Sequence, residues 1–139
     1  YGVGGLRLGV LVSGDIKAIN EIGKGLPIWN INSISENFLQ IVQKYKKEFN
    51  ESCFQISQER DYFFKQLEKI PFIEPYPSQA NYILCKVVGI DAKDLCSKMY
   101  SKHNIFIKLY DHENFPNFIR ISIRSGENNS DLISAFLTI

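Results

Sequence analysis

The sequence has few of the residues that build metal centres and disulfide frameworks. It contains two histidines and three cysteines, Cys53, Cys85 and Cys96, in 139 residues. An odd number of cysteines without a CxxC pair argues against a disulfide framework, and the histidines lack metal-ligand spacing. We therefore expect free thiols in a reducing, cytoplasmic setting and no bound metal.

An excess of one charge and long apolar runs are also lacking. The formal net charge is +1, so no basic field favours binding to nucleic acid. No apolar run approaches the length of a membrane span. The composition, 45% hydrophobic and 13% aromatic, is ordinary for a globular protein and argues against disorder. We therefore expect small-molecule partners and neither nucleic acid nor membrane.

The first 32 residues have the pattern of a parallel α/β sheet. Leu6–Val12 is an apolar run whose length suits a strand buried on both faces. Asp15 is a good N-cap, isoleucines at helical spacing follow it, and Gly23 and Gly25 should end the helix. Because the chain opens without Met on a glycine-rich turn that runs straight into this strand, we expect it to be a fragment of a longer protein.

Residues 33–71 have a helical pattern. Ser33 and Glu36 have the spacing of a capping box, so a helix should start there. Apolar residues recur at helical spacing until Pro71, which ends the pattern. These helices should join two structural units, residues 1–32 and residues 72–139.

Residues 72–139 read as a small α+β unit, so the fold class as a whole is α/β and α+β. Short strands and helices alternate there, separated by turn residues. Phe72–Glu74 is predicted to be a short extended piece that Pro75 and Pro77 limit to a sheet edge or a loop. The other predicted elements are a strand at Asn81–Val87, a helix from Asp91 to Asn104, a strand at Ile105–Lys108, a polar loop at Asp111–Asn117, a strand at Phe118–Arg124 and a helix from Glu127.

Arg7 lies in an otherwise apolar segment, just after the glycines Gly2, Gly4 and Gly5. A buried arginine without a partner is costly, so Arg7 requires an anion. A phosphate suits its planar guanidinium, and glycines allow the backbone to approach a bound group closely. A carboxylate elsewhere in the fold would satisfy Arg7 as well, and the pattern leaves both alternatives open.

Arg120 and Arg124 share the polar face of the predicted strand Phe118–Arg124. A guanidinium on a rigid strand can hold a substrate carboxylate through two parallel hydrogen bonds. An ordinary solvated face would alternate in the same way. The pattern therefore leaves a carboxylate-binding role and a solvated face as alternatives for both arginines.

Two asparagines are further candidates for binding. Asn32 ends a linker that contains Trp29, and linkers often carry binding residues on a rigid scaffold. Asn81 opens a predicted strand after two prolines and could line a cleft. Packing of Trp29 at a hinge and closure of a turn by Asn81 are the structural alternatives.

The opening segment Tyr1–Gly9 (YGVGGLRLG) resembles the stretch that follows the Schiff-base lysine in fold-type I enzymes that use pyridoxal 5'-phosphate (PLP). The family pattern reads Ser-Lys-small-aromatic-Gly-x-x-Gly-Leu-Arg-x-Gly, which places the lysine two positions before Tyr1. The resemblance implies that Arg7 binds the phosphate of the PLP cofactor. It also implies that the catalytic lysine lies just upstream, so we expect no catalytic residue in this chain and no activity of the fragment alone.

Three further stretches resemble, in order and spacing, the histidinol-phosphate-aminotransferase-like branch of that family. Pro27–Ser33 (PIWNINS) resembles its Pro-x-Asn-Val-x-Ser segment before the interdomain helix, and Pro77–Leu84 (PSQANYIL) resembles its Ser-x-Ala-Asn-Phe-Ile-Leu strand. Phe118–Asn129 (FIRISIRSGENN) resembles its Arg-Ile-Ser-Ile-Gly-Thr-x-Glu-Glu-Asn ending. In the family the arginine that matches Arg120 binds the carboxylate of the substrate.

The resemblance implies the C-terminal portion of a PLP-transferase fold, with the end of the large domain, the interdomain helices and a small domain whose short sheet is covered by helices. It implies an aminotransferase that exchanges an amino group between an amino acid and a 2-oxo acid, and a homodimer. Its implied substrate-binding residues are Arg120, Asn32 and Asn81. Arg124 replaces the family's usual Gly, and the extra charge suits a substrate with a second anionic group, such as a phosphate or phosphonate.

Other interpretations stay open. Threonine-phosphate decarboxylases share the motif set, including Trp-x-x-Asn near the hinge. A non-catalytic α+β ligand-binding module is also possible, although it leaves Arg7 unexplained. Tyr1–Gly9 and Trp29–Ser33 further resemble the aminotransferase domain of bifunctional proteins that carry an N-terminal nucleotidyltransferase, and the chain leaves open whether such a domain precedes it.

Overall fold

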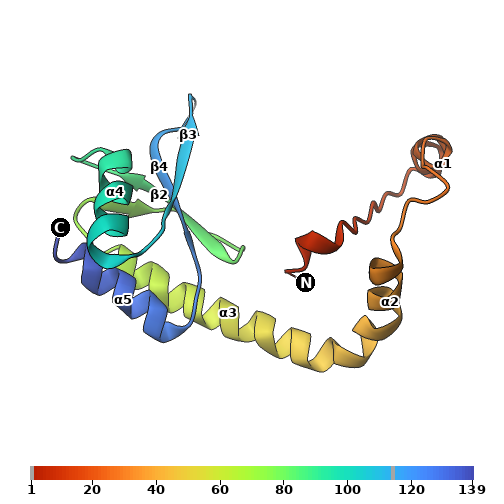
Figure 1. Cartoon of the computed structure of the whole chain (residues 1–139), viewed down its shortest axis with the longest axis horizontal. Coiled ribbons are helices and arrows are strands. Elements are labelled where there is room, and N and C mark those ends of the chain that lie inside the picture. Colours follow the sequence, from red (N-terminus) through yellow and green to blue (C-terminus); the bar gives the residue numbers. More distant parts are fainter. Residues whose placement is uncertain (1, 114) are drawn as a thin grey trace. The chain divides into compact units, whose positions relative to one another are not determined.

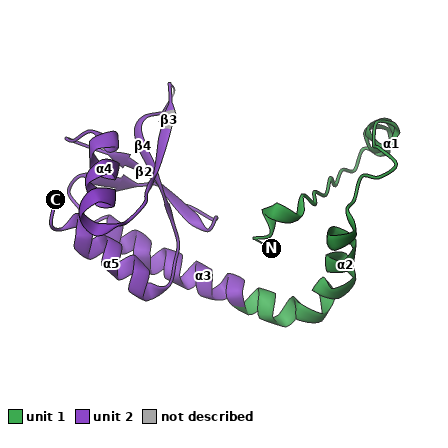
Figure 2. Ribbon diagram, in the orientation of Figure 1, with its two compact units in different colours: residues 1–51 green, residues 52–139 purple. Residues whose placement is uncertain are grey.

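The computed structural model describes residues 2–113 and 115–139, so Tyr1 of the opening segment and Asn114 of the predicted polar loop lie outside the described residues. The chain forms two compact units, residues 1–51 and 52–139 (Figures 1 and 2). The predicted functional division at residues 32/33 and 71/72 stays a prediction. Of the helices described, none is both long and apolar enough to cross a membrane.

The first unit consists of short helices joined by extended segments. Its elements are η1 (Gly4–Leu6), α1 (Ile16–Lys24), α2 (Ser33–Ile41), η2 (Val42–Tyr45) and the start of α3 (Lys46–Leu67). The carboxylate of Asp15 accepts hydrogen bonds from the backbone N–H groups of Lys17 and Ala18, at 2.9 and 3.1 Å. Gly25 follows the last turn of α1 as its C-cap. The predicted start and end of this helix are therefore confirmed.

The predicted buried strand at Leu6–Val12 is wrong. A short 3-10 helix ends at Leu6, and the residues that follow it form no strand. Val10 and Val12 are 81% and 86% exposed. A parallel strand needs neighbours that pair with its backbone and cover both faces. The described part of the first unit contains no strand to do so, and consequently Arg7 is exposed and not buried.

Helix α2 begins at Ser33 as predicted, but the predicted capping box is wrong. The N-cap is Asn32, whose side-chain oxygen accepts a hydrogen bond from the N–H of Ser35 at 2.9 Å. Ser33 therefore occupies the first helical position and not the cap. Asparagine and serine are similarly good caps, so local sequence preference did not distinguish neighbouring positions.

The second unit contains a four-stranded antiparallel sheet with the order β1-β2-β4-β3. Strand β1 lies at one edge, as the prolines around it predicted. The edge strand next to β4 differs from the prediction, because it starts where the predicted strand Ile105–Lys108 ends. The strands are β1 (Ile73–Pro75), β2 (Tyr82–Val87), β3 (Lys108–His112) and β4 (Phe115–Ser122).

The predicted polar loop at Asp111–Asn117 is also wrong over most of its length. Strand β3 continues to His112, and β4 begins at Phe115 and runs through Asn117. The two strands pair as a hairpin with a register shift between Tyr110 and His112. Pairing with a neighbouring strand therefore extended the sheet into a polar segment, as happens when hairpin register overrides local preference.

Helices cover one face of this sheet and leave the other open. Helix α4 (Ala92–His103) starts at its cap Asp91 and ends at Asn104, and α5 (Gly126–Phe136) follows β4. Together with the C-terminal half of α3, these helices pack on the alternating apolar residues of β2 and β4. The predicted alternation of β4 is confirmed, because Ile119 and Ile121 are buried and Arg120 lies on the exposed face. The core comprises Phe63, Leu67, Ile70, Ile73, Ile83, Cys85, Val87, Ala92, Leu95, Met99, Ile107, Ile119, Ile121, Leu132, Ala135 and Phe136.

Candidate functional site

The candidate site of the second unit lies on the open face of the sheet, around Arg120. In the register of the sheet, Arg120 of β4 lies opposite Leu84 of β2 and Lys108 of β3. Two cations directly opposite each other repel and destabilise the pair of strands. Arg120 has no carboxylate partner among the described residues. An exposed guanidinium next to a lysine and without an acid is arranged to accept an anion.

An aromatic ring supports the guanidinium of Arg120. Its central carbon lies 4.9 Å from the centre of the Tyr82 ring, a distance that allows a cation–π interaction. Tyr82 is two residues from Leu84, the direct neighbour of Arg120 across the β2–β4 pair. The strand pairing and the ring together restrict where the guanidinium can point, which a carboxylate-binding group requires.

A cleft of about 640 Å³ adjoins Arg120 on this face. Residues 76–80, which precede β2, form one wall, and Tyr110 and Phe115 of the β3–β4 hairpin form another. The rings of Tyr110 and Phe115 meet edge to face, with centroids 5.8 Å apart. The cleft therefore combines one cation with a lining that includes several aromatic rings, which suits a ligand that has an anionic end and an apolar body.

A second hollow of about 540 Å³ shares Arg120 with the first. Lys108 and Arg124 also line it, and Asp131 is the acidic side chain that does so. The structure thus brings Arg120 and Arg124 to one place. The predicted strand Phe118–Arg124 is wrong at its end, because β4 ends at Ser122 and Arg124 lies two residues beyond it. Lys108 was missed, because the signal that could have found it is a strand register that joins residues twelve positions apart.

Arg124 is held at the end of β4 by a buried asparagine. Its N–H donates to the side-chain oxygen of Asn129, and its carbonyl accepts from the Asn129 amide, each at 3.0 Å. The same amide also donates to Glu59 of α3 at 3.3 Å. Asn129 is 4% exposed, so its hydrogen bonds are well shielded from water. The backbone that carries Arg124 is therefore fixed to helices α3 and α5.

Asn81, a predicted substrate-binding residue, lies outside the lining of the site around Arg120. Its backbone carbonyl accepts a hydrogen bond from the N–H of Ile123 at 2.9 Å, which extends the β2–β4 pairing by one residue. Its side chain is exposed and lines neither the cleft nor the hollow around Arg120. A role of Asn81 in substrate binding stays a prediction.

In the first unit, Asn32 connects the glycine-rich segment to helix α2. Its amide donates to the carbonyl of Leu6 at 3.0 Å, while its oxygen caps the helix. The hydroxyl of Ser35 donates to the same carbonyl at 2.6 Å, and Ser35 is fully buried. The residue that precedes Arg7 is therefore fixed to the start of α2 by two hydrogen bonds from side chains.

Arg7 itself occupies the left-handed backbone region, with φ 57°. Its guanidinium is exposed and has no acidic partner in the described part of the chain. Around the neighbouring Gly4 and Gly5, an added Cβ would meet no atom within 4 Å. An unpaired guanidinium beside open backbone fits a phosphate, which requires positive charge and room for its oxygens.

Two of the three thiols of the second unit, Cys85 and Cys96, are poorly suited to nucleophilic chemistry. Burial raises the pKa of Cys85 to about 12. The pKa of Cys96 is also raised, by burial and by the nearby charge of Asp91. A cysteine acts as a nucleophile through its thiolate, which these environments disfavour. The candidate site thus offers cations that suit an anion, and neither of these two thiols suits it as a nucleophile.

Comparison with known proteins identifies the family of the chain. Residues 1–136 match the family "Aminotransferase class I and II". The CMP-5'-(3-aminopropyl)phosphonate synthase of Streptomyces rubellomurinus is 30% identical over all of this chain and 23% of its own length. The histidinol-phosphate aminotransferase of Clostridium novyi is 33% identical over 96% of this chain and 36% of its own length. The chain thus spans about a quarter to a third of these relatives.

Solved structures give the same result. The histidinol-phosphate aminotransferase of Clostridium acetobutylicum superposes with a TM-score of 0.84 at 26% identity, over 97% of this chain and 41% of the other. A decarboxylase from Sulfurospirillum multivorans superposes with a TM-score of 0.79 at 29% identity, over 99% of this chain and 40% of the other. The predicted PLP-transferase fold is therefore confirmed. The predicted homodimer and a preceding nucleotidyltransferase domain stay predictions.

Proposed function

The chain belongs to the aminotransferase class I and II family, and from that premise we propose that it forms the substrate-carboxylate side of a PLP-dependent aminotransferase. The proposed reaction moves an amino group between an amino acid and a 2-oxo acid. The observation that carries the proposal is the guanidinium of Arg120, which is exposed on a rigid strand, supported by Tyr82 and without an acidic partner among the described residues. A carboxylate supplies the missing charge.

In this proposal the first unit binds the phosphate of the cofactor. The family uses PLP, which supplies an electron sink for chemistry at the substrate's α-carbon. Arg7 would hold the cofactor's phosphate, since its guanidinium has no other anion in the described chain. Asn32 and Ser35 would keep the adjoining backbone in place through the carbonyl of Leu6. The lysine that the family uses is expected outside this chain.

Lys108 and Arg124 support a substrate with a second anionic group. Both line the hollow that also contains Arg120, and neither has an acidic partner in the described structure. The three cations of the hollow outnumber its one carboxylate, Asp131. A bound substrate carboxylate still leaves a net positive charge there for a phosphate or phosphonate. We therefore propose a phosphorylated or phosphonate-bearing amino acid as the preferred donor.

The main test replaces Arg120 by Lys in the intact PLP-loaded enzyme. Lysine keeps the charge but loses the planar pair of donors, so KM for the amino donor should rise about 10- to 100-fold. Lys86→Met is the matched control, because Lys86 is an exposed cation of the neighbouring strand that lines neither hollow. Steady-state kinetics that give the same KM for Arg120→Lys and wild type would overturn the proposal.

The proposed second anionic group of the substrate is tested by comparing an amino donor that carries a phosphate with one that does not. Lys108→Met and Arg124→Gly should each raise KM for a phosphorylated donor about tenfold, roughly the effect of one lost charge-assisted hydrogen bond. KM for the matching donor without phosphate should stay within twofold. Equal changes for the two donors, or no change for either, would exclude a role for these cations in recognising phosphate.

Decarboxylation is the second candidate reaction. It is favoured by the superposition on a decarboxylase at 29% identity. It uses the same binding groups, so the structure of this chain serves either reaction. Release of CO₂ from a phosphorylated amino acid, without formation of a 2-oxo acid, would identify the protein as a decarboxylase.

A further inference from the structure

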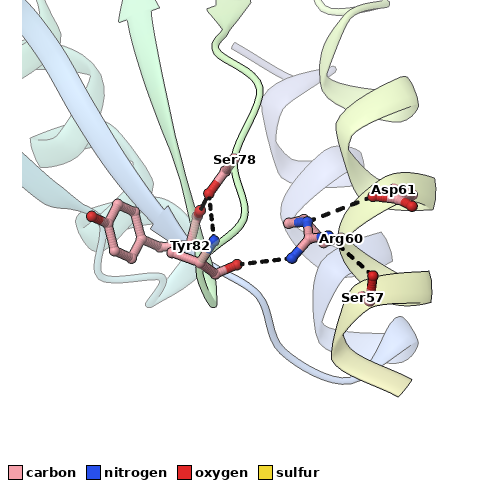
Figure 3. A network of polar contacts seen from close by, with 6 residues as sticks. Ser57, Arg60, Asp61, Ser78 and Tyr82 are labelled. Carbon is pink, nitrogen blue, oxygen red and sulfur yellow. Dashed lines mark hydrogen bonds and ion pairs between the residues drawn. The ribbon is translucent and has the colours of Figure 1, made fainter. Parts of the chain in front are cut away.

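Arg60 of helix α3 carries a buried charge that the proposed site does not use directly. Its side chain is 9% exposed, and the exposed carboxylate of Asp61 lies 3.5 Å from its Nε. Its terminal nitrogens donate to the hydroxyl of Ser57 at 3.0 Å and to the backbone carbonyl of Ala80 at 3.5 Å (Figure 3). No hydrogen bond to a described residue satisfies Nε.

This arrangement is a poor source of stability. Burying a guanidinium is costly, and a single long ion pair to an exposed carboxylate offsets little of that penalty. An apolar side chain of similar volume would connect α3 to the sheet at least as well. An apolar side chain cannot donate a hydrogen bond to the carbonyl of Ala80. We infer that this hydrogen bond is the reason for the buried charge.

Ala80 belongs to a short segment that is itself held by hydrogen bonds. The hydroxyl of Ser78 accepts from the N–H of Ala80 at 3.0 Å and donates to the carbonyl of Tyr82 at 2.6 Å. Arg60 holds the same segment from the side of α3. Residues 78–82 therefore have one connection to the helix, at the carbonyl of Ala80, and two internal connections, at the N–H of Ala80 and the carbonyl of Tyr82 (Figure 3).

The segment also separates two spaces. One side faces the cleft that contains Arg120, and the other faces a hollow of about 380 Å³ lined by Arg60 and Lys65. Ser78 and Gln79 line both spaces. A shift of this segment would therefore move the ring of Tyr82 from the guanidinium of Arg120, because the carbonyl of Tyr82 is bonded to Ser78.

We propose that Arg60 is a positioning residue that holds residues 78–82 so that Tyr82 keeps Arg120 oriented for the carboxylate of the substrate. The inference rests on the proposed function for the identity of that ligand. The geometric part, in which Arg60 controls the state of Arg120, is independent of any substrate and can be measured by itself.

The geometric part is tested by chemical labelling of arginine in the intact protein. Phenylglyoxal modification, followed for each arginine by mass spectrometry, reports how freely the guanidinium of Arg120 reacts. Arg60→Met should raise the labelling rate of Arg120 to the rate seen in Tyr82→Leu, which removes the ring directly. Lys65→Met is the matched control on the same helix and hollow, and it should leave the rate at the wild-type value. A wild-type rate for Arg120 in Arg60→Met would overturn the proposal.

The functional part is tested by kinetics of the PLP-loaded enzyme. Arg60→Met should raise KM for the amino donor about fivefold, the effect of one lost hydrogen bond, with kcat within twofold. Arg60→Lys keeps a donor and should recover part of the loss. A merely structural Arg60 would instead lower the amount of active enzyme and leave the KM of the remainder unchanged, and that result would contradict the proposal.

A second variant covers the case in which Arg60→Met does not fold. Ser78→Ala removes both internal hydrogen bonds of the segment without changing α3, and it should raise both the labelling of Arg120 and KM. Unchanged values in Ser78→Ala would count against the proposal. If Arg120→Lys leaves KM unchanged while Arg60→Met still raises labelling of Arg120, the proposed function fails and the positioning role stands.

Discussion

The two units differ in how they use apolar residues of similar kind. In residues 52–139, alternating strands and helix faces bury their apolar side chains in one core. In residues 1–51, the described side chain that is fully buried is Ser35, and apolar residues such as Trp29, which is 91% exposed, lie on the surface. Helix caps are formed equally well in both units, by Asp15 and by Asp91. Local signals therefore suffice for helices, whereas a core requires partners that are distant in sequence.

The largest expected difference between the units concerns packing. Phe63→Ala should lower the free energy of unfolding by about 3–5 kcal/mol, because the ring is 1% exposed in the core of the second unit. Trp29→Ala in the first unit should change it by less than about 0.5 kcal/mol. Urea denaturation of the 139-residue chain measures both. A loss at Trp29 comparable to that at Phe63 would show that the first unit has a core of its own.

Removal of a helix cap should have a smaller effect on the free energy of unfolding, and this effect should differ between the two units. Asp91→Ala removes a hydrogen bond to the N–H of Asp94 at the start of α4, which packs on the core. It should lower the free energy of unfolding by about 1 kcal/mol. Asp15→Ala removes two such bonds from α1, whose described residues are not buried. It should instead increase local hydrogen exchange in α1 and leave the global unfolding midpoint unchanged. A shift of that midpoint in Asp15→Ala would link α1 to the cooperative core.

The smallest effect expected at neutral pH comes from Cys85 in the second unit, because its ionisation affects stability only in alkaline solution. The pKa of Cys85 is raised from 9.0 to about 12 by burial. Above pH 9 the unfolded chain ionises this thiol while the folded chain does not. Stability should therefore be complete below pH 9 and decrease as the pH rises toward 12.

The measurement for Cys85 is the free energy of unfolding at several pH values, in wild type and in Cys85→Ala. The decrease specific to Cys85 should disappear in the variant. Labelling with a thiol reagent provides the comparison between environments, because exposed Cys53 should react in the folded protein and Cys85 only after unfolding. Fast reaction of Cys85 in the folded state would contradict its burial.

Much of the second unit could be predicted because its signals are local. Asp91 and Asn104 bound helix α4 as expected, and Ile119 and Ile121 alternate with Arg120 on β4. The hairpin of β3 and β4 could not be predicted in this way. Its polar residues favour a loop, and pairing across the hairpin together with an aromatic cluster that includes Tyr110 and Phe115 favours strands.

Asn117 was predicted to lie in a loop, but in the structure its side chain holds the start of a helix to the sheet. It adopts a positive φ of 66° in β4, and its side chain donates to the carbonyls of Val87 and Ile90 and accepts from the N–H of Ala92. The start of α4 is thereby fastened to the sheet. Sequence preference identifies asparagine as tolerant of this backbone, but the partners lie about 25 to 30 residues away.

The candidate site also has some features set by local sequence and others set by tertiary structure. The sequence by itself determined the caps of α1 and α4, the alternation of the strand that carries Arg120 and the family motifs around Arg7, because each depends on residues a few positions apart. Only the tertiary structure decided that Lys108 lies opposite Arg120, that Tyr82 supports it, and that Arg60 is buried against Ala80. From the sequence alone, a cation on an amphipathic helix is expected to be solvated, because the segments that cover it are known only from the folded structure. Burial and cross-strand pairing are properties of residues brought together by folding, and no local pattern records them.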